Sequence, residues 1–315
     1  CCPNSQSHRN LLWVSASWAA TVKAMLKLVL PKGSLEKATL QLFGEADLTV
    51  SRSSEVDYRA TINDPRVDDV RILRPQEIPG YVAEGLFDVG IAGRDWIEET
   101  SSDVVSLGQM KYSKATARPV RIVVAVPANS GYESISDLPD GVKVSSEYPE
   151  LTRRHFLAAG VQADIRLSYG ATEAKAPDIV DAVVDLTETG SALKAAGLKI
   201  IDEILTSYTE LFANRKSYED PIKRKAMEQI KTLLDGVLDA RGRVLMKLNV
   251  ARENLDGVIE VLPSMKSPTV NELWGGGGFA VETVVNKADI NLLIPELLEL
   301  GATDVIELPI SKIVP

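Results

Sequence analysis

Short, almost wholly apolar runs separated by helical stretches constrain the fold of this chain more than any other feature. Leu26–Leu30, Asp88–Gly93 and Ala182–Asp185 are such runs. Strands that are buried on both faces show this continuous pattern, whereas strands with one face in water alternate between apolar and polar residues. The pattern therefore predicts an α/β protein with largely parallel sheets that helices cover on both faces.

Two α/β lobes are predicted from the order of these runs. We expect lobe I to comprise residues 25–114 plus 200–220, and lobe II to comprise 115–199, because strands 198–205 and 209–213 are placed to return from the second lobe to the first. A two-lobed, periplasmic-binding-protein-like core of this kind offers a small-molecule site between its lobes.

A smaller domain is predicted at the carboxyl end. Asp220 and Pro221 are suited to the N-cap and first position of a long linker helix over 221–242. Residues 243–315 then follow the order strand, helix, strand, strand, helix, strand. That order is the ferredoxin-like βαββαβ arrangement, which by itself assigns no function.

The first 24 residues do not match this pattern. Met25 opens directly onto the first strand, so 1–24 is interpreted as an extension outside the fold. Residues 11–20 resemble the apolar part of a signal peptide, but only one Arg precedes them and the chain starts without Met. No window approaches 18 uninterrupted apolar residues, so no membrane-spanning helix is expected.

Charge and composition exclude several classes of function. With 35 Lys and Arg against 44 Asp and Glu the net charge is −9, which argues against nucleic acid as a partner. The two cysteines are adjacent, at Cys1 and Cys2, so no disulfide framework is expected and a reducing, cytoplasmic location is favoured. His8 and His155 are the only histidines, which argues against a Ser-His-Asp triad or a multi-histidine metal site.

The segment with the clearest chemistry is the turn between a strand ending at Asp185 and the helix that begins after Ser191. Gly190 permits a tight bend, Thr189 and Ser191 supply hydroxyls, and the first amides of the helix point to the same place. A phosphate monoester suits such a turn, although the same residues could serve only as helix caps. Asp181 and Asp185 are four apart on one strand and could hold sugar hydroxyls or a magnesium-bound diphosphate.

Other candidate residues follow strands more loosely. Lys32 and Gly33 come directly after the first strand, at the edge where open α/β sheets bind ligands. Arg52 and Arg74 could each face a ligand or form only a solvated rim, and one of Arg153 and Arg154 could face the cleft. Gly275–Gly278 lies between two predicted antiparallel strands and is interpreted as a hairpin, since no helix follows it to make a phosphate loop.

Four segments in this order resemble ATP phosphoribosyltransferase in its long, self-regulated form. The resemblance spans essentially residues 25–315. Its most specific part is similar to that family's phosphoribosyl-diphosphate loop and reads A-P-D-I-V-D-A-V-V-D-L-T-E-T-G-S-A-L. It is supported by three further segments, L-P-K-G-S-L, L-R-P-Q-E-I-P-G-Y-V-A-E-G-L-F-D-V-G-I-A-G and Y-P-E-L-T-R-R-H-F. The segment M-K-S-P-T-V resembles the regulatory domain.

The resemblance implies the first reaction of histidine biosynthesis, in which N1 of ATP attacks C1′ of phosphoribosyl diphosphate and diphosphate leaves with Mg²⁺ as cofactor. By matching position, Lys32 and Asp185 would be catalytic. The substrate-binding positions that it implies are Arg52, Arg74, Asp88, Tyr148, Thr152, Arg153, Asp181, Glu188, Thr189, Gly190, Ser191 and Ala192. The family commonly has Thr where Ala192 stands, which removes one hydroxyl from the phosphate site.

The regulatory domain is implied to bind histidine as a feedback inhibitor. Its matching positions are Asn249, Met265, Ser267, Pro268 and Thr269. An acidic residue is often found where Asn249 stands. The resemblance also implies a homo-oligomer, with dimers that assemble into hexamers.

Two other functions fit part of the sequence. A bilobed solute-binding protein would share the two lobes and the D-V-G-I-A-G strand, and a catalytically silent regulatory subunit would share the tail. The turn at 185–193 argues against the first, and Lys32, Asp185 and the Thr-Gly-Ser turn argue against the second.

Overall fold

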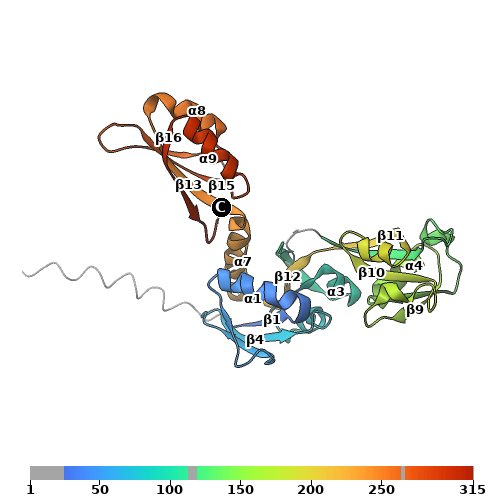
Figure 1. Cartoon of the computed structure of the whole chain (residues 1–315). Coiled ribbons are helices and arrows are strands. Elements are labelled where there is room, and N and C mark those ends of the chain that lie inside the picture. The colour runs from blue at the N-terminus through green and yellow to red at the C-terminus, as the bar shows by residue number, and fades with distance from the viewer. Residues whose placement is uncertain (1–24, 113–118, 264–266, 315) are drawn as a thin grey trace, which may run out of the picture. The chain divides into compact units, whose positions relative to one another are not determined.

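A computed structural model describes residues 25–112, 119–263 and 267–314 (Figure 1). The predicted extension over 1–24 and the predicted ligand residue Met265 lie outside the described residues. The chain divides into two compact units. Unit 1 takes its described residues from 1–36, 50–109 and 119–228, and unit 2 from 37–49, 110–118 and 229–315.

Unit 1 contains two sheets, each of which we take with its helices as one lobe. The seven-stranded sheet of lobe I has the order β2-β3-β4-β1-β5-β12-β6. Its strands are β1 (Leu26–Pro31), β2 (Val50–Ser51), β3 (Arg59–Ile62), β4 (Val67–Leu73), β5 (Val89–Gly93), β6 (Val104–Gln109) and β12 (Thr209–Asn214). The strands β4, β1 and β5 are parallel, and β12 is antiparallel to β5.

Lobe I is covered on one face by two short helices. They are α2 (Ile78–Ala83) and α3 (Arg94–Glu99). Ile78 and Val82 of α2 and Ile97 of α3 are buried in one apolar cluster with Val29 and Phe212 of the sheet. The sequence predicts a longer helix over 76–86, and the structure shortens it to the six residues of α2.

Lobe II is built on a five-stranded sheet of order β11-β7-β10-β8-β9. Its elements are β7 (Val120–Pro127), β8 (Val142–Ser146), α4 (Pro149–Ala158), β9 (Ala163–Leu167), β10 (Ala182–Thr187), α5 (Ser191–Ala195) and β11 (Leu198–Ser207). The parallel strands β8, β9 and β10 form the half of the sheet that the sequence predicts to be covered on both faces: Phe156 of α4 packs on one face and Leu193 of α5 on the other. Strand β11 pairs with β7 as far as Ser207, so the chain changes sheets at residue 208 and not at 199.

One helix predicted in lobe II, over 173–180, does not form. A single 3₁₀ turn over Thr172–Lys175 takes its place, and irregular backbone leads from there to Val180. Pro177 explains the difference, because it has no backbone N–H to donate and it disfavours helical backbone at Ala176. Val180 is nevertheless buried in the core under α5.

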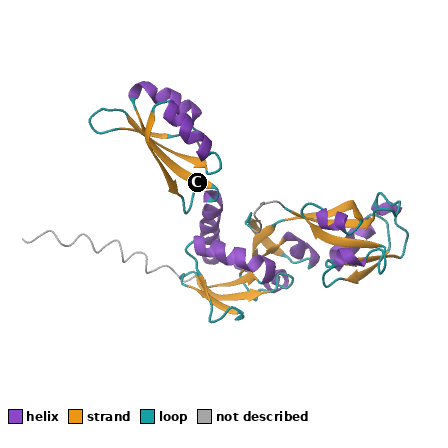
Figure 2. Ribbon diagram, in the orientation of Figure 1, coloured by secondary structure: helices purple, strands orange, loops and turns teal. Residues whose placement is uncertain are grey.

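The last unit-1 helices are α6 (Arg215–Glu219) and α7 (Pro221–Ala240), and α7 continues into unit 2. Unit 2 also holds most of α1 (Glu36–Glu45) and the carboxyl-terminal domain. That domain consists of β13 (Arg243–Val250), α8 (Leu255–Val261), β14 (Thr269–Glu272), β15 (Phe279–Asn286), α9 (Ile290–Glu299) and β16 (Ala302–Pro309). The sheet order β14-β15-β13-β16 confirms the ferredoxin-like arrangement, and Figure 2 shows α8 and α9 on one face of this sheet.

Candidate active site

The turn after β10 is held in shape by its own side chains. Gly190, with φ +75°, is the N-cap of α5, and its amide donates a hydrogen bond of 2.8 Å to the hydroxyl of Thr187. The Ser191 amide donates to the Thr189 hydroxyl at 3.3 Å, and that hydroxyl donates to the Ser191 hydroxyl at 2.9 Å. The bend is thus preorganised by hydroxyls that flank it.

The helix that follows leaves two amides without an acceptor of its own. Bonding within the helical turn begins where the Lys194 amide donates to the carbonyl of Gly190 at 3.0 Å. The amides of Ala192 and Leu193 precede that bond, and amides at these positions have no partner inside a helix. The predicted substrate residues 189–192 are therefore brought together around a tight bend with two amide donors.

Sequence reasoning missed two residues beside this turn. Thr187, which is 9% exposed, anchors the Gly190 amide. Glu147 follows β8, and β8 pairs with β10 so that Ser146 lies opposite Val184, one residue before Asp185. Only the strand order reveals this neighbour, since Glu147 and Asp185 are far apart in the chain.

The two carboxylates at these strand ends are both held in surroundings that disfavour their charge. Burial, and next the negative charge of Asp185, raises the pKa of Glu147. Burial also raises the pKa of Asp185, against a hydrogen bond of 2.7 Å from the Leu186 amide. The Lys175 ammonium acts in the opposite direction on both groups, and it also donates to the hydroxyl of Ser168.

Asp181 lies at the other end of the same strand. Its carboxylate accepts a hydrogen bond of 2.9 Å from the Lys143 amide at the start of β8, and its own amide donates to the Lys143 carbonyl. Asp181 directly precedes β10 and closes the amino edge of the sheet, whereas Asp185 lies within β10, which continues to Thr187.

In lobe I, the predicted site residues Lys32, Arg52 and Arg74 each follow a strand, β1, β2 and β4 respectively. The ammonium of Lys32 sits over the ring of Tyr58, 4.1 Å from its centre. Arg74 directly follows β4. Arg52 follows β2 and forms an ion pair of 2.8 Å with Glu36. Gly33, with φ +87°, occupies the 3₁₀ turn after Lys32.

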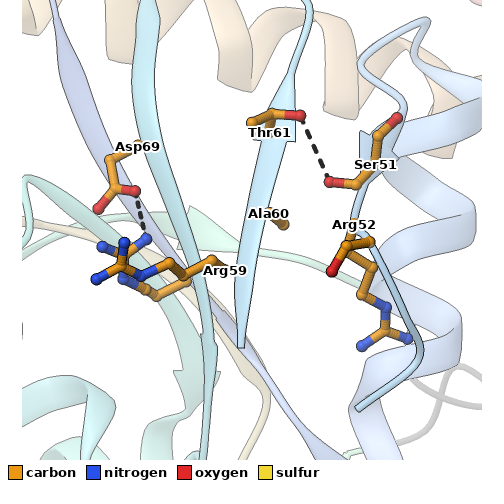
Figure 3. Close-up of a pocket in the computed structure, with 8 residues that line it drawn as sticks. Ser51, Arg52, Arg59, Ala60, Thr61 and Asp69 are labelled. Carbon is orange, nitrogen blue, oxygen red and sulfur yellow. Dashed lines mark hydrogen bonds and ion pairs between the residues drawn. The ribbon is translucent and has the colours of Figure 1, made fainter. Parts of the chain in front are cut away.

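A pocket of about 340 Å³ opens on the strands that carry Arg52 (Figure 3). Its lining consists of Ser51, Arg52, Ser53, Arg59, Ala60, Thr61, Asp69 and Arg71. Arg59 of β3 lies directly opposite Arg71 in the neighbouring antiparallel strand β4. Arg71 also forms an ion pair of 2.5 Å with Asp69. Like charges opposite each other destabilise a strand pair, so an anion between the two guanidinium groups would stabilise it.

Asp88 does not reach a ligand edge. It precedes β5 and is 5% exposed, and its carboxylate accepts hydrogen bonds from the Lys27 amide (2.8 Å), the Ser217 hydroxyl (2.6 Å) and the Lys223 ammonium (2.7 Å). Since ligands of open α/β sheets bind beyond the carboxyl ends of strands, this position does not support the substrate role predicted for Asp88. Asp88 instead fastens the first turn of α7 to lobe I.

The residues predicted on the rim of lobe II are mostly buried. Tyr148 is 2% exposed, and its hydroxyl donates to the Asp95 carboxylate at 2.7 Å. Thr152 is fully buried and donates to the Tyr148 carbonyl at 2.7 Å. Arg153 alone is exposed, in an ion pair with Glu150.

In the carboxyl-terminal domain, the predicted histidine-binding residues lie on and beside the sheet. Asn249 of β13 donates to the carboxylate of Asp304 at 2.9 Å. Ser267 and Thr269 are exposed, and Pro268 is half-buried. An acidic group is thus present beside Asn249, although it comes from β16.

Two features are absent from the described residues. None of the helices described is long and apolar enough to cross a membrane. Within residues 25–112, 119–263 and 267–314, no group of three or more His, Cys, Asp or Glu side chains is arranged to hold a metal ion.

Two α/β lobes, with a tight turn that leads from a strand into the start of a helix, define a class of α/β proteins with a candidate anion site. Comparison with known proteins specifies the family. The family model described as ATP phosphoribosyltransferase matches residues 74–236, and the model described as HisG, C-terminal domain, matches 240–312. The chain belongs to the ATP phosphoribosyltransferase family, and it is an enzyme.

Individual relatives agree with the family models. ATP phosphoribosyltransferase from Pelotomaculum thermopropionicum is 44% identical over 92% of this chain and 99% of its own length, and the protein of that name from Desulforudis audaxviator is 45% identical over the same shares. Among solved structures, the ATP phosphoribosyl transferase (HisG:HisZ) complex from Thermotoga maritima superposes with a TM-score of 0.57 at 26% identity, covering 67% of this chain and 99% of that chain. The resemblance inferred from the sequence is therefore confirmed, and so is the two-lobed α/β fold with its small carboxyl-terminal domain.

Proposed function

We propose that this enzyme joins N1 of ATP to C1′ of phosphoribosyl diphosphate and releases diphosphate, as the first step of histidine biosynthesis. Family membership and the geometry of the turn after β10 support the assignment. The turn offers the 5-phosphate a rigid bend, with hydroxyls at Thr189 and Ser191 and amides at Ala192 and Leu193. A fixed phosphate aligns the anomeric carbon for attack.

The chemistry needs no strong base, because the adenine ring nitrogen already carries a lone pair. It does need negative charge near C1′, which becomes cation-like as the bond to diphosphate breaks, and positive charge near the leaving group. Asp185 supplies the first. Lys32, Arg52 and Arg74, which follow strands of lobe I, supply the second.

The arginine pocket of Figure 3 extends this positive charge toward the nucleotide side. Three arginines, Arg52, Arg59 and Arg71, are among its lining residues, together with the hydroxyl residues Ser51, Ser53 and Thr61 and the acidic residue Asp69. Guanidinium groups and hydroxyls are the usual partners of phosphate oxygens. We assign the phosphates of ATP to this pocket.

The residues at the strand ends of lobe II fit a magnesium ion that the substrate brings. Mg²⁺ in such enzymes keeps several waters and takes only one or two carboxylates besides phosphate oxygens. Glu147 and Asp185 are two carboxylates whose raised pKa values reflect burial and neighbouring negative charge, which a cation would relieve. When bound, Mg²⁺ would offset charge on the leaving diphosphate.

The carboxyl-terminal domain is proposed to bind histidine as a feedback inhibitor, and the enzyme to work in the cytoplasm as a homo-oligomer of dimers or hexamers. Asn249 replaces the acidic residue often found in the family. Asp304, bonded to Asn249, places a carboxylate within reach of the same position and could receive the histidine ammonium group. An Asp304→Asn variant should then need more histidine for half-inhibition at unchanged uninhibited activity.

Turnover is the direct test. The full chain is mixed with ATP, phosphoribosyl diphosphate and Mg²⁺, and the absorbance of the adduct is followed. Formation of the adduct, dependent on all three, is expected. If no adduct forms while both substrates still bind, the solute-binding interpretation takes its place.

A further inference from the structure

Acidic side chains of α3, the short helix after β5, take part in the contact between lobe I and lobe II. Glu99 is 9% exposed, and its carboxylate accepts hydrogen bonds from the backbone amides of Glu150 (3.0 Å) and Leu151 (2.7 Å) in lobe II. These are the first free amides of α4, because Pro149 before them has no N–H. A lobe I carboxylate therefore caps a lobe II helix.

The helix needs this cap from outside. Its own N-cap residue is Tyr148, whose side chain makes no capping hydrogen bond. Helices that begin without Ser, Thr, Asp or Asn at this position leave their first amides unsatisfied. A carboxylate at a helix N-terminus is also favoured by the partial positive charge there. Glu99 thus supplies what the local sequence of α4 lacks.

A second buried acid engages Tyr148 itself. Asp95 is 5% exposed, and one carboxylate oxygen accepts from the Tyr148 hydroxyl at 2.7 Å. The other accepts at 2.8 Å from the hydroxyl of Ser207, the residue at which β11 leaves the sheet of lobe II. The ring of Trp96 packs against that of Tyr148, with centres 4.6 Å apart. Asp95 therefore ties both the start of α4 and the crossing strand to lobe I.

In a third contact, a charged side chain of lobe II donates hydrogen bonds to lobe I. Arg154 of α4 donates to the Ser101 hydroxyl at 2.5 Å and to the Glu98 carbonyl. The junction formed by Asp95, Glu99 and Arg154 is thus reciprocal, with donors and acceptors on both lobes.

The junction lies next to the candidate chemistry. Tyr148 directly follows Glu147, the carboxylate at the end of β8, and β8 is paired with β10, which ends in the phosphate turn. A shift of α4 against α3 would therefore move Glu147 and the turn together relative to Lys32 and the arginine pocket. Small displacements of reacting groups have large effects on rate.

We propose that Glu99 and Asp95 are positioning residues, which hold the catalytic strand ends of lobe II at a fixed place relative to lobe I. The proposal rests on the function proposed above, in which the two lobes carry different parts of the substrates. Both carboxylates are buried and hydrogen-bonded to lobe II, so neither is placed to contact substrate. Their contribution is therefore to the rate of the bound complex and not to the affinity of either substrate alone.

Glu99→Gln is the main test, and Glu98→Gln is its matched control. A glutamine at position 99 has one acceptor oxygen, and its NH₂ group would face the second helix amide, which is also a donor. The Glu98 side chain instead pairs with Arg94 on the surface of the same helix, so Glu98→Gln should leave the cap intact. In Glu99→Gln we expect kcat to fall about tenfold or more, with less than about a twofold change in the dissociation constant of phosphoribosyl diphosphate. Hydrogen exchange should accelerate in a peptide covering 149–152 and stay unchanged in the strands of lobe II.

Tyr148→Phe is the second variant, in case Glu99→Gln folds poorly. It keeps the ring on Trp96 and removes only the hydrogen bond to Asp95, so kcat should fall by about threefold, with a change in Trp96 fluorescence. Wild-type kcat in both variants, with lower Tm alone, would overturn the proposal. Absence of adduct with the wild-type enzyme would instead overturn the proposed function, while the exchange measurement would still report on the cap.

Discussion

The anion sites proposed for the two lobes are of two different kinds. In lobe II the turn after β10 relies on backbone: a glycine at φ +75°, hydroxyls that hold the bend, and amides that the helix leaves unpaired. In lobe I the pocket relies on side chains, with Arg59 and Arg71 opposite each other on neighbouring strands. A backbone site is lost when one residue cannot adopt its conformation. A side-chain site should weaken in steps, one charge at a time.

The largest effect is expected from Gly190→Leu. A side chain there is strained by the positive φ, and its Cβ would lie 3.2 Å from the Ile200 side chain. We expect turnover to fall about a hundredfold or more, because the bend that aligns the phosphate is displaced. The measurement is the steady-state rate of adduct formation.

Gly197→Leu is the matched control for this variant. Gly197, at the other end of α5, shares the positive φ (+76°) but has open space where a Cβ would stand. Similar loss of stability with near-normal turnover is expected. Equal turnover in the two variants would show that the backbone turn is not the phosphate site.

The bend of this turn could be predicted from the sequence because its parts are adjacent in the chain, whereas its phosphate-binding role stays a prediction. Gly190, Thr189 and Ser191 form the bend with their immediate neighbours, and apolar periodicity likewise predicts the βαββαβ domain. Glu147 could not be assigned in this way, because its role follows from the pairing of β8 with β10, which is a tertiary property. Asp88 lies before β5, and this place in the sequence already indicates the amino edge of the sheet, away from the edge where ligands bind. The family resemblance alone does not reveal this difference.

Thr187→Val should have the next largest effect, and it tests whether the hydroxyl that holds the turn contributes to substrate binding. Valine has nearly the same shape but cannot accept the hydrogen bond from the Gly190 amide. Loss of one buried hydrogen bond of about 1 kcal/mol corresponds to roughly a fivefold rise in KM for phosphoribosyl diphosphate. KM for ATP should change little. A rise in both would mean that the turn serves both substrates.

Arg71→Ala tests the other half of the comparison. If guanidinium groups act one at a time, its loss should raise KM for ATP by about three- to fivefold, the range of a partly exposed ion pair. The effect should shrink as salt is added, because exposed charges are screened. Arg66→Ala is the control: Arg66 pairs with Asp64 and does not line the pocket. A loss of about a hundredfold in Arg71→Ala, which is far beyond one such pair, would break the contrast between the two lobes.

The smallest effect is expected on thermal stability, from removing the buried negative charge of Asp185. Burial raises the pKa of Asp185, so between the ordinary aspartate pKa near 4 and this raised value the folded chain binds more protons than the unfolded chain. Stability must then fall as pH increases through that window. Asp185→Asn removes the penalty and is expected to have a higher Tm than the wild-type enzyme at about pH 7, with the difference shrinking toward about pH 4.

Asp181→Asn is the control for this measurement. It should show no such gain in Tm, because the Asp181 carboxylate accepts the Lys143 amide at the opposite edge of the sheet. A pH-independent difference in Tm for Asp185→Asn would mean that folding does not shift the pKa of Asp185, because neighbouring groups such as the Lys175 ammonium balance the effect of burial. The acidic strand end would then carry no stability cost for a bound cation to relieve, and the electrostatic argument for magnesium beside Glu147 would lose its support.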